Sequence, residues 1–146
     1  MEQRLSFVTL GVADLDRARA FYSALGWTPS RYGEGAGIVF FQLNGIVMGL
    51  FPRAELAADA DLANTPPNGF GGITLSHNTR SRSEADAALA EAVAAGGRIL
   101  KPLHETSWGG YVGYFADPDG HPWEICFNPD ATIAADGAVS FQRPKT

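Results

Sequence analysis

Hydrophobic and polar positions in the first third of the chain follow two different periods. Apolar residues alternate with others over Leu5–Val12, a period of two that is typical of a β-strand with unlike faces. From Asp14 to Gly26 they recur every three or four positions, which predicts an amphipathic helix with Asp14 as its N-cap and Gly26 at its end. Further strands are predicted at Trp27–Arg31, Ile38–Leu43 and Ile46–Phe51, the last two joined by an Asn44-Gly45 turn.

The second half of the chain shows the same succession. Gly72–His77 alternates like the first strand, and Ser83–Ala95 reads as a helix that ends at Gly96-Gly97. Ser83 and Asp86 have the spacing of a capping box. Later strands are predicted at Arg98–Lys101, Tyr111–Phe115 and Trp123–Phe127, with a turn at Asp117–Gly120. The order β-α-β-β-β therefore occurs twice.

The register of the repeat can be read from matching residues. Thr9-Leu10 matches Thr74-Leu75, 65 positions later (9 to 74). Asn44-Gly45 matches Asp119-Gly120, 75 positions later (44 to 119), and the same offset places Phe40 on Phe115. Because one such unit cannot cover its own sheet, we predict an α+β fold of two paired βαβββ modules in a single domain, 1–146.

The expected boundaries follow from this repeat. Module one spans about 5–51 and module two about 70–128. A connector, about 52–69, begins with an Ala-rich helix at Ala54–Ala60. The tail, 129–146, contains a short strand at Val139–Phe141.

Composition excludes several classes of protein. Hydrophobic residues make up 45% and charged residues 18% of the chain, as in globular proteins. The net charge is −5 and the 11 Lys and Arg residues are scattered, so we expect no nucleic-acid partner. Cys126 is the only cysteine, which excludes an internal disulfide and a cysteine-rich zinc site. Because there is neither a leader pattern nor an apolar run of about 20 residues, we expect a cytoplasmic protein without membrane association.

Two segments carry a family resemblance. Val8–Tyr22, followed by Leu25-Gly26, and Phe115–Ile125 with its Asp-Pro-Asp-Gly turn resemble the opening and closing signatures of the vicinal-oxygen-chelate superfamily. This group contains glyoxalase I, bleomycin resistance proteins and extradiol dioxygenases. The resemblance covers roughly residues 5–128. It implies a curved mixed sheet that forms a cup, with helices outside and a ligand inside.

The resemblance also implies where a metal would be bound. In metal-using members four side chains meet on the cup floor, and the matching positions here are Phe7, Gly49, Gly72 and Glu124. The repeat offsets relate them in the same way, 7 to 72 and 49 to 124. Only Glu124 has a side-chain donor for a divalent cation. We therefore expect a degenerate metal site, with no metal ligands and no cofactor.

Glu124 is the residue on which function is expected to depend. We rank three interpretations: an anchor for a ligand, a relic of metal-binding ancestors, and a catalytic acid or base. Gly49 and Gly72 either deepen the cup or meet a local packing need. Cys126 is interpreted as a small buried hydrophobe. The ligand-binding residues are predicted to be Phe7, Thr9, Phe40, Gly49, Phe51, Gly72, Thr74, Trp108, Tyr111, Phe115 and Glu124.

Two functions of different classes remain open. The first is a metal-independent small-molecule binding protein, which holds a partly aromatic ligand near Glu124. The alternative is a lyase, isomerase or dioxygenase-like enzyme of the same superfamily, which uses Glu124 or a metal site at other residues. We expect a homodimer in either case, because proteins of the resembled superfamily often pair modules between chains.

Overall fold

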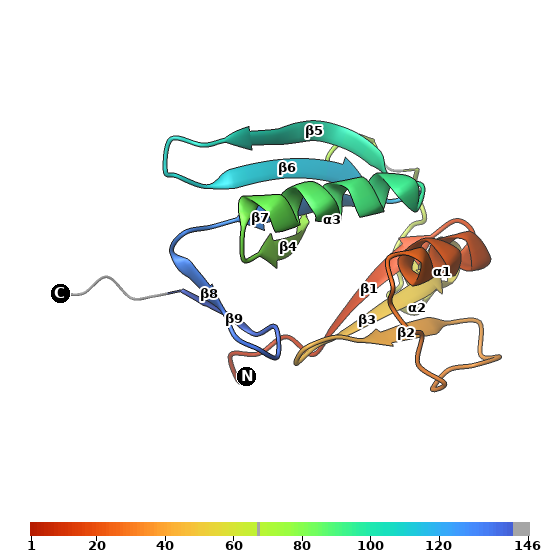
Figure 1. Cartoon of the computed structure of the whole chain (residues 1–146). Coiled ribbons are helices and arrows are strands. Elements are labelled where there is room, and N and C mark those ends of the chain that lie inside the picture. The colour runs from red at the N-terminus through yellow and green to blue at the C-terminus, as the bar shows by residue number, and fades with distance from the viewer. Residues whose placement is uncertain (67, 142–146) are drawn as a thin grey trace. The chain divides into compact units, whose positions relative to one another are not determined.

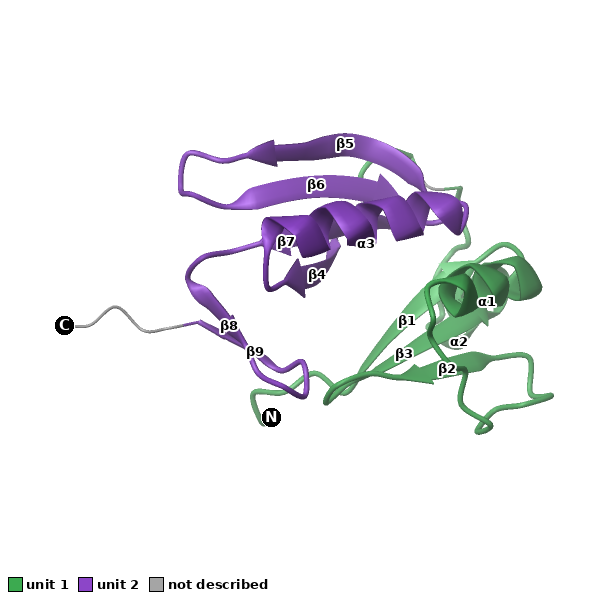
Figure 2. Ribbon diagram, in the orientation of Figure 1, with its two compact units in different colours: residues 1–73 green, residues 74–146 purple. Residues whose placement is uncertain are grey.

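The structure is a computed structural model that describes residues 1–66 and 68–141. The chain divides into two compact units, Met1–Ile73 and Thr74–Thr146, shown in two colours in Figure 2. Each unit is described by itself, and the single domain remains a prediction. Pro67 of the expected connector and residues 142–146 of the expected tail lie outside the described residues.

The first unit is built on a three-stranded mixed sheet of order β1-β3-β2 (Figure 1). Strands β1 and β3 are parallel, and β2 and β3 form an antiparallel hairpin through the predicted Asn44-Gly45 turn. At Gly45 the backbone has a φ of 72°, which glycine adopts without strain. The elements of the first unit are β1 (Phe7–Val12), α1 (Leu15–Ala24), β2 (Val39–Gln42), β3 (Val47–Pro52) and α2 (Arg53–Asp59).

Helix α1 covers one face of this sheet. Asp14 is its N-cap, as predicted, and its carboxylate accepts a hydrogen bond from the Arg17 N–H. On the covered side Leu50 is fully buried, and Tyr22 of α1 lies 5.9 Å from the Phe41 ring of β2. Burial of these apolar groups is the main stabilising contribution to the unit. The opposite face, here the Gly49 face, carries Phe7, Thr9, Phe40, Gly49 and Phe51.

The strand expected at Trp27–Arg31 is a wrong prediction. Within the described part of the chain no strand forms between α1 and β2, and a single backbone bond, from Ser30 N–H to the Phe40 carbonyl, joins this segment to β2. Pro29 has no N–H to donate to a sheet. Gly35 and Gly37 have φ values of 78° and 73°, which turn the chain. The first unit is therefore β-α-β-β rather than a complete module.

The second unit has the complete βαβββ succession. Its four-stranded sheet has the order β4-β7-β6-β5, with β4 and β7 parallel and the other pairs antiparallel. The predicted strand at Val139–Phe141 forms and pairs with Ala131–Ile133. The elements are β4 (Leu75–Thr79), α3 (Arg82–Ala94), β5 (Arg98–Glu105), β6 (Tyr111–Ala116), β7 (Pro122–Phe127), β8 (Ala131–Ile133) and β9 (Val139–Phe141).

Helix α3 packs on β6 and β7 of this sheet. It begins earlier than expected, because its N-cap is Ser81, which accepts from the Glu84 N–H at 3.1 Å. Ser83 and Asp86, the predicted capping pair, lie inside the helix. The core side of the sheet contains Trp123, which is 7% exposed. Mixed sheets with three helices confirm the α+β class.

Strand β4 also differs from expectation. It begins at Leu75, not at Gly72, which lies outside the strand with a φ of 82°. Thr9 pairs with Gly49 in the first unit, and Ser76 pairs with Glu124 in the second. The first strands of the two units are therefore related by 67 positions (9 to 76) rather than 65.

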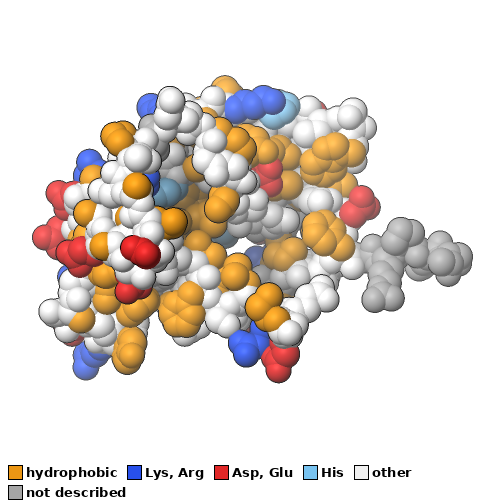
Figure 3. All heavy atoms as spheres, turned by 180° about the vertical axis from the view of Figure 1, so that it is seen from behind, with side chains coloured by type: hydrophobic (Ala, Val, Ile, Leu, Met, Phe, Trp, Pro, Cys, Tyr) orange, Lys and Arg blue, Asp and Glu red, His pale blue; other side chains and the backbone are white. Residues whose placement is uncertain are grey.

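Large hydrophobic side chains remain exposed in both units. On the side of the molecule shown in Figure 3 they lie among acidic and basic side chains. Phe7 is 53% exposed in the first unit, and Trp108 is 50% exposed in the second. Over the described residues, no helix combines the length and apolar character that crossing a bilayer requires.

Candidate functional site

Glu124 lies at the centre of a cluster of hydroxyl groups in the second unit. It is on β7, and strand pairing places Ser76 of β4 on one side and Tyr114 of β6 on the other. Ser76 Oγ donates to Glu124 Oε1 at 3.0 Å, and the Tyr114 hydroxyl donates to Glu124 Oε2. Each carboxylate oxygen therefore has a hydroxyl partner from a neighbouring strand. We call Ser76, Tyr114 and Glu124 the Glu124 cluster.

Charge and hydrogen bonding shift the titration of Tyr114. The hydrogen bond to Glu124, and next the partial burial of the phenol, raise the pKa of Tyr114 to about 12 from its ordinary 10. Tyr114 therefore stays protonated at neutral pH. Because both hydroxyl protons point to the carboxylate, the oxygens of Ser76 and Tyr114 can only accept further hydrogen bonds. The cluster thus offers acceptors and a negative charge.

Cys126 lies on the same side of β7 as Glu124, two residues later. It is 5% exposed, and burial raises the pKa of its thiol. A protonated, buried thiol is a poor nucleophile. This placement agrees with the interpretation of Cys126 as a small buried hydrophobe.

The repeat offset that places Phe40 on Phe115 predicts that Phe115 lies opposite Glu124, on the same side of the sheet, and this prediction is wrong. Phe115 pairs with Trp123, and the two rings stack on the core side with centroids 6.1 Å apart. The reason is the hairpin connection: residues 117–121 link β6 to β7, one more than residues 43–46 between β2 and β3. A one-residue shift exchanges the two faces of a strand. Tyr114 therefore takes the position opposite Glu124 that Phe40 takes opposite Gly49.

Tyr111 also lies on the side of β6 that faces α3. Its hydroxyl donates to Asp86 Oδ1 of α3 at 2.9 Å, so Tyr111 is placed away from the Glu124 cluster. Sequence reasoning missed Ser76 and Tyr114, and the length of the segment 117–121 was the one signal that could have identified Tyr114.

Trp108 lies in the loop between β5 and β6. Its indole covers Gly110, where an added Cβ would come within 1.9 Å of the ring. Arg82 anchors this loop through a bidentate pair with Glu105, at 2.7 and 3.0 Å, and a bond to the Gly109 carbonyl. Trp108 therefore lies in a turn that Arg82 connects to the start of α3.

The Gly49 face brings together the predicted ligand-binding residues of the first unit. The Phe7 and Phe40 rings meet edge to face, with centroids 6.0 Å apart. A Cβ at Gly49 would lie 3.2 Å from Thr9 Oγ1 and 3.4 Å from the Phe40 ring. The absence of a side chain at Gly49 therefore leaves room for both neighbours. Tyr32, which sequence reasoning missed, extends the aromatic row with its ring 5.8 Å from Phe40.

The four predicted floor positions are divided between the units. Phe7, Gly49 and Gly72 belong to the first and Glu124 to the second, so their clustering remains a prediction. Thr74 immediately precedes β4 in the second unit.

The residues at these positions do not fit a divalent cation. Phe7, Gly49 and Gly72 have no side-chain donor, so Glu124 is the one donor residue at positions where a divalent cation needs several. In the part of the chain that the structure describes, no three His, Cys, Asp or Glu side chains gather as a metal site would require. The three histidines are placed separately; His121 Nδ1, for example, lies 2.9 Å from Asp117 Oδ2.

Similar structures are found over nearly the whole chain. A glyoxalase-related enzyme from Fulvimarina pelagi is 40% identical, with a TM-score of 0.87, and the match covers 97% of this chain and 100% of that one. A hypothetical protein from S. aureus is 26% identical, with a TM-score of 0.72 and coverage of 88% and 95%. A lactoylglutathione lyase from Agrobacterium tumefaciens is 25% identical, with a TM-score of 0.65 and coverage of 87% and 95%.

No curated protein matches this chain in sequence. The family model described as Glyoxalase/Bleomycin resistance protein/Dioxygenase superfamily matches residues 4–125. This range includes both units, from the start of β1 into β7. The chain therefore belongs to the Glyoxalase/Bleomycin resistance protein/Dioxygenase superfamily.

Proposed function

We propose that this chain is a metal-independent small-molecule binding protein that holds its ligand against Glu124. The observation that carries the proposal is the pairing of each Glu124 oxygen with a hydroxyl of the same chain, Ser76 on one side and Tyr114 on the other. A divalent cation needs several oxygen or nitrogen donors, and one carboxylate does not supply them. Here it is oriented by two strands of its own sheet, and the remaining floor positions have no donor to offer.

The chemistry of the Glu124 cluster defines the ligand class. Because the cluster has acceptors and a negative charge, it favours a ligand with N–H donors and a positive charge. The partly aromatic character that the sequence predicts for the ligand is kept in this proposal. The proposed ligand is therefore a partly aromatic amine or amidine.

Calorimetry on a charge variant tests the role of Glu124. Benzamidine and phenethylamine serve as cationic probes, with benzyl alcohol as a neutral one. Glu124→Gln keeps the shape but removes the charge, and should weaken cation binding by about tenfold to a hundredfold. Asp86→Asn is the matched control, because Asp86 also accepts from a tyrosine hydroxyl but lies on α3. Equal cation binding by Glu124→Gln and the parent chain contradicts the proposal.

A volume variant tests the Gly49 face separately. A Cβ at Gly49 already reaches Thr9 and Phe40, so Gly49→Leu fills the space beside these residues. Any probe that binds on the Gly49 face should be weakened, whether it is cationic or neutral, since the variant removes volume rather than charge. Unchanged binding of all probes excludes this face as a ligand surface.

Elemental analysis tests metal independence. The purified protein should contain less than stoichiometric zinc, nickel, iron and manganese. One tightly held metal ion per chain that is lost in Glu124→Ala overturns the metal-independent function.

An enzymatic function is the second candidate. The observation that favours it is the 40% identity to a protein described as a glyoxalase-related enzyme. In a metal-free lyase or isomerase, Glu124 would accept a proton from carbon and return it to a neighbouring atom. Turnover of the hemithioacetal of methylglyoxal and glutathione by the metal-depleted protein, abolished by Glu124→Gln, would establish this function instead of simple binding.

A further inference from the structure

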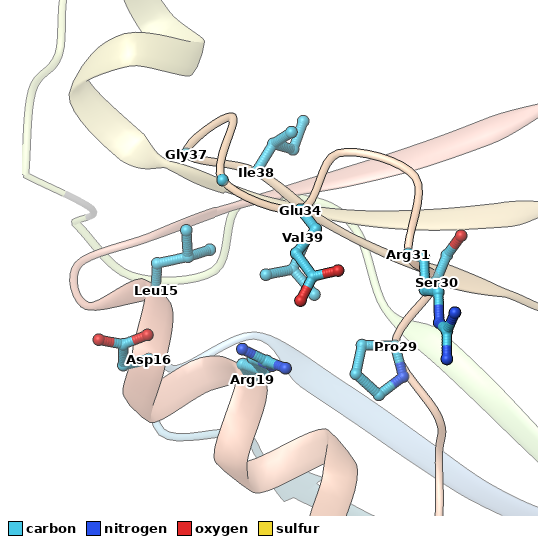
Figure 4. Close-up of a pocket in the computed structure, with 11 residues that line it drawn as sticks. Leu15, Asp16, Arg19, Pro29, Ser30, Arg31, Glu34, Gly37, Ile38 and Val39 are labelled. Carbon is cyan, nitrogen blue, oxygen red and sulfur yellow. The ribbon is translucent and has the colours of Figure 1, made fainter.

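A pocket of about 340 Å³ lies in the first unit, away from the Gly49 face. It is bounded by α1, by residues 29–37 and by the start of β2 (Figure 4). Residues 29–37 are called the glycine-containing segment here. Val39, which lines it, pairs with Leu50, and Leu50 is buried on the side of the sheet that α1 covers. This volume is within the range of small-molecule sites.

Four charged side chains line this pocket, Asp16, Arg19, Arg31 and Glu34, and the opposite charges of Arg19 and Glu34 face each other across it. Arg19 comes from α1 and Glu34 from the segment before β2, and Figure 4 shows the guanidinium and the carboxylate turned toward the same space. Among the described residues, neither side chain has an ion pair or a side-chain hydrogen bond. An unpaired cation and anion on facing walls are complementary to a ligand that carries both charges.

The rest of the wall provides apolar surface. Leu15 and Pro29 line the pocket from two sides, and Ile38 and Val39 lie at the start of β2. The glycine-containing segment brings Glu34 over this surface, because Gly35 and Gly37 turn the backbone through left-handed conformations. The pocket thus combines a charged pair with an apolar patch.

We propose that this pocket binds a free α-amino acid with a branched apolar side chain. The carboxylate of the ligand pairs with Arg19 and its ammonium group with Glu34. The apolar side chain lies against Leu15, Ile38 and Val39. This site is independent of the Glu124 cluster, so either site can fail without the other.

L-Leucine and two analogues that each lack one charge test the ligand class. 4-Methylpentanoate keeps the carboxylate, and 3-methylbutylamine keeps the amine. NMR titration of the full chain should show leucine-dependent shifts at the amides of Leu15, Ile38 and Val39. Each analogue should bind at least tenfold more weakly. If leucine leaves these amides unshifted at millimolar concentration, or if either analogue binds as well as leucine, the proposal is wrong.

Variants assign the two charges. Arg19→Gln should reduce leucine affinity about tenfold and leave 3-methylbutylamine binding unchanged, while Glu34→Gln should reduce leucine affinity and leave 4-methylpentanoate binding unchanged. The matched controls are Arg98→Gln on β5 and Glu55→Gln on α2, which lie outside the pocket. Equal losses in these controls, or no loss in Arg19→Gln and Glu34→Gln, overturn the assignment.

Discussion

The hydrogen bond between Tyr114 and Glu124 should be visible in the titration of Tyr114. The pKa of Tyr114 is raised to about 12, first by the hydrogen bond to Glu124, then by burial and by the charge of Glu124. Glu124→Gln removes the charge and weakens the hydrogen bond but leaves the burial. The pKa of Tyr114 should therefore fall below 12 in this variant, toward its ordinary value.

The same shift has a consequence for stability. A tyrosine whose pKa is higher in the folded than in the unfolded chain stabilises the fold fully below the unfolded pKa. This contribution is lost as the pH rises from 10 to about 12. The full shift would correspond to about 2.7 kcal/mol, and solvent screening of this partly exposed pair reduces it to about 1 kcal/mol. The free energy of unfolding of the parent should thus fall more steeply with alkaline pH than that of Glu124→Gln.

NMR of ¹³Cζ-labelled tyrosine measures this titration directly, with Tyr114→Phe to assign the signal. At about pH 11, Tyr114 should be mostly protonated in the parent and ionised to a larger fraction in Glu124→Gln. Asp86→Asn is the control, since Asp86 raises the pKa of Tyr111 through the same kind of bond. This control variant should change the pKa of Tyr111 and leave that of Tyr114 unchanged. A Tyr114 that titrates near 10 in the parent, or identically in Glu124→Gln, would refute the geometry of the cluster.

Further predictions concern stability and assembly. Gly97→Ala should reduce the free energy of unfolding by about 1–3 kcal/mol, because its Cβ would lie 2.8 Å from the Ala92 carbonyl oxygen. Gly71→Ala has no neighbour within 4 Å and should be neutral in the same denaturant titration. Ser81→Ala removes the hydrogen bond from the Glu84 N–H that caps α3. It should reduce the free energy of unfolding by about 1 kcal/mol, which thermal unfolding measures. Sedimentation at high micromolar concentration should show a homodimer, and a monomer there would contradict the expected assembly.

The spacing of apolar residues and the identities of the turn and cap residues were enough to predict most of the helices and strands. Asp14 capped the first helix and Asn44-Gly45 joined a hairpin because each acts locally, within a few residues of its own position. The strand at Trp27–Arg31 failed for a different reason. Pro29 cannot donate a hydrogen bond to a neighbouring strand, and the glycines that follow turn the chain through positive φ values.

The candidate site was harder to predict because it depends on register between distant strands. Glu124 was identified from its place in the closing signature, but its hydroxyl partners were not. Ser76 reaches it from a strand 48 positions earlier, and Tyr114 reaches it only because the β6–β7 connection has its particular length. Alternation alone cannot fix such pairings, since it leaves the offset between two strands undetermined.

The unequal hairpin connections of the two units have an evolutionary consequence. If the units descend from a duplicated ancestor, gain or loss of a single residue between β6 and β7 would exchange every side chain that β6 presents on its two sides. One such event turns Tyr114 toward Glu124 and Phe115 toward the core without any substitution in the strand. Insertions and deletions in a turn thus allow duplicated halves to diverge in chemistry in one step, whereas point mutations would have to change several positions together.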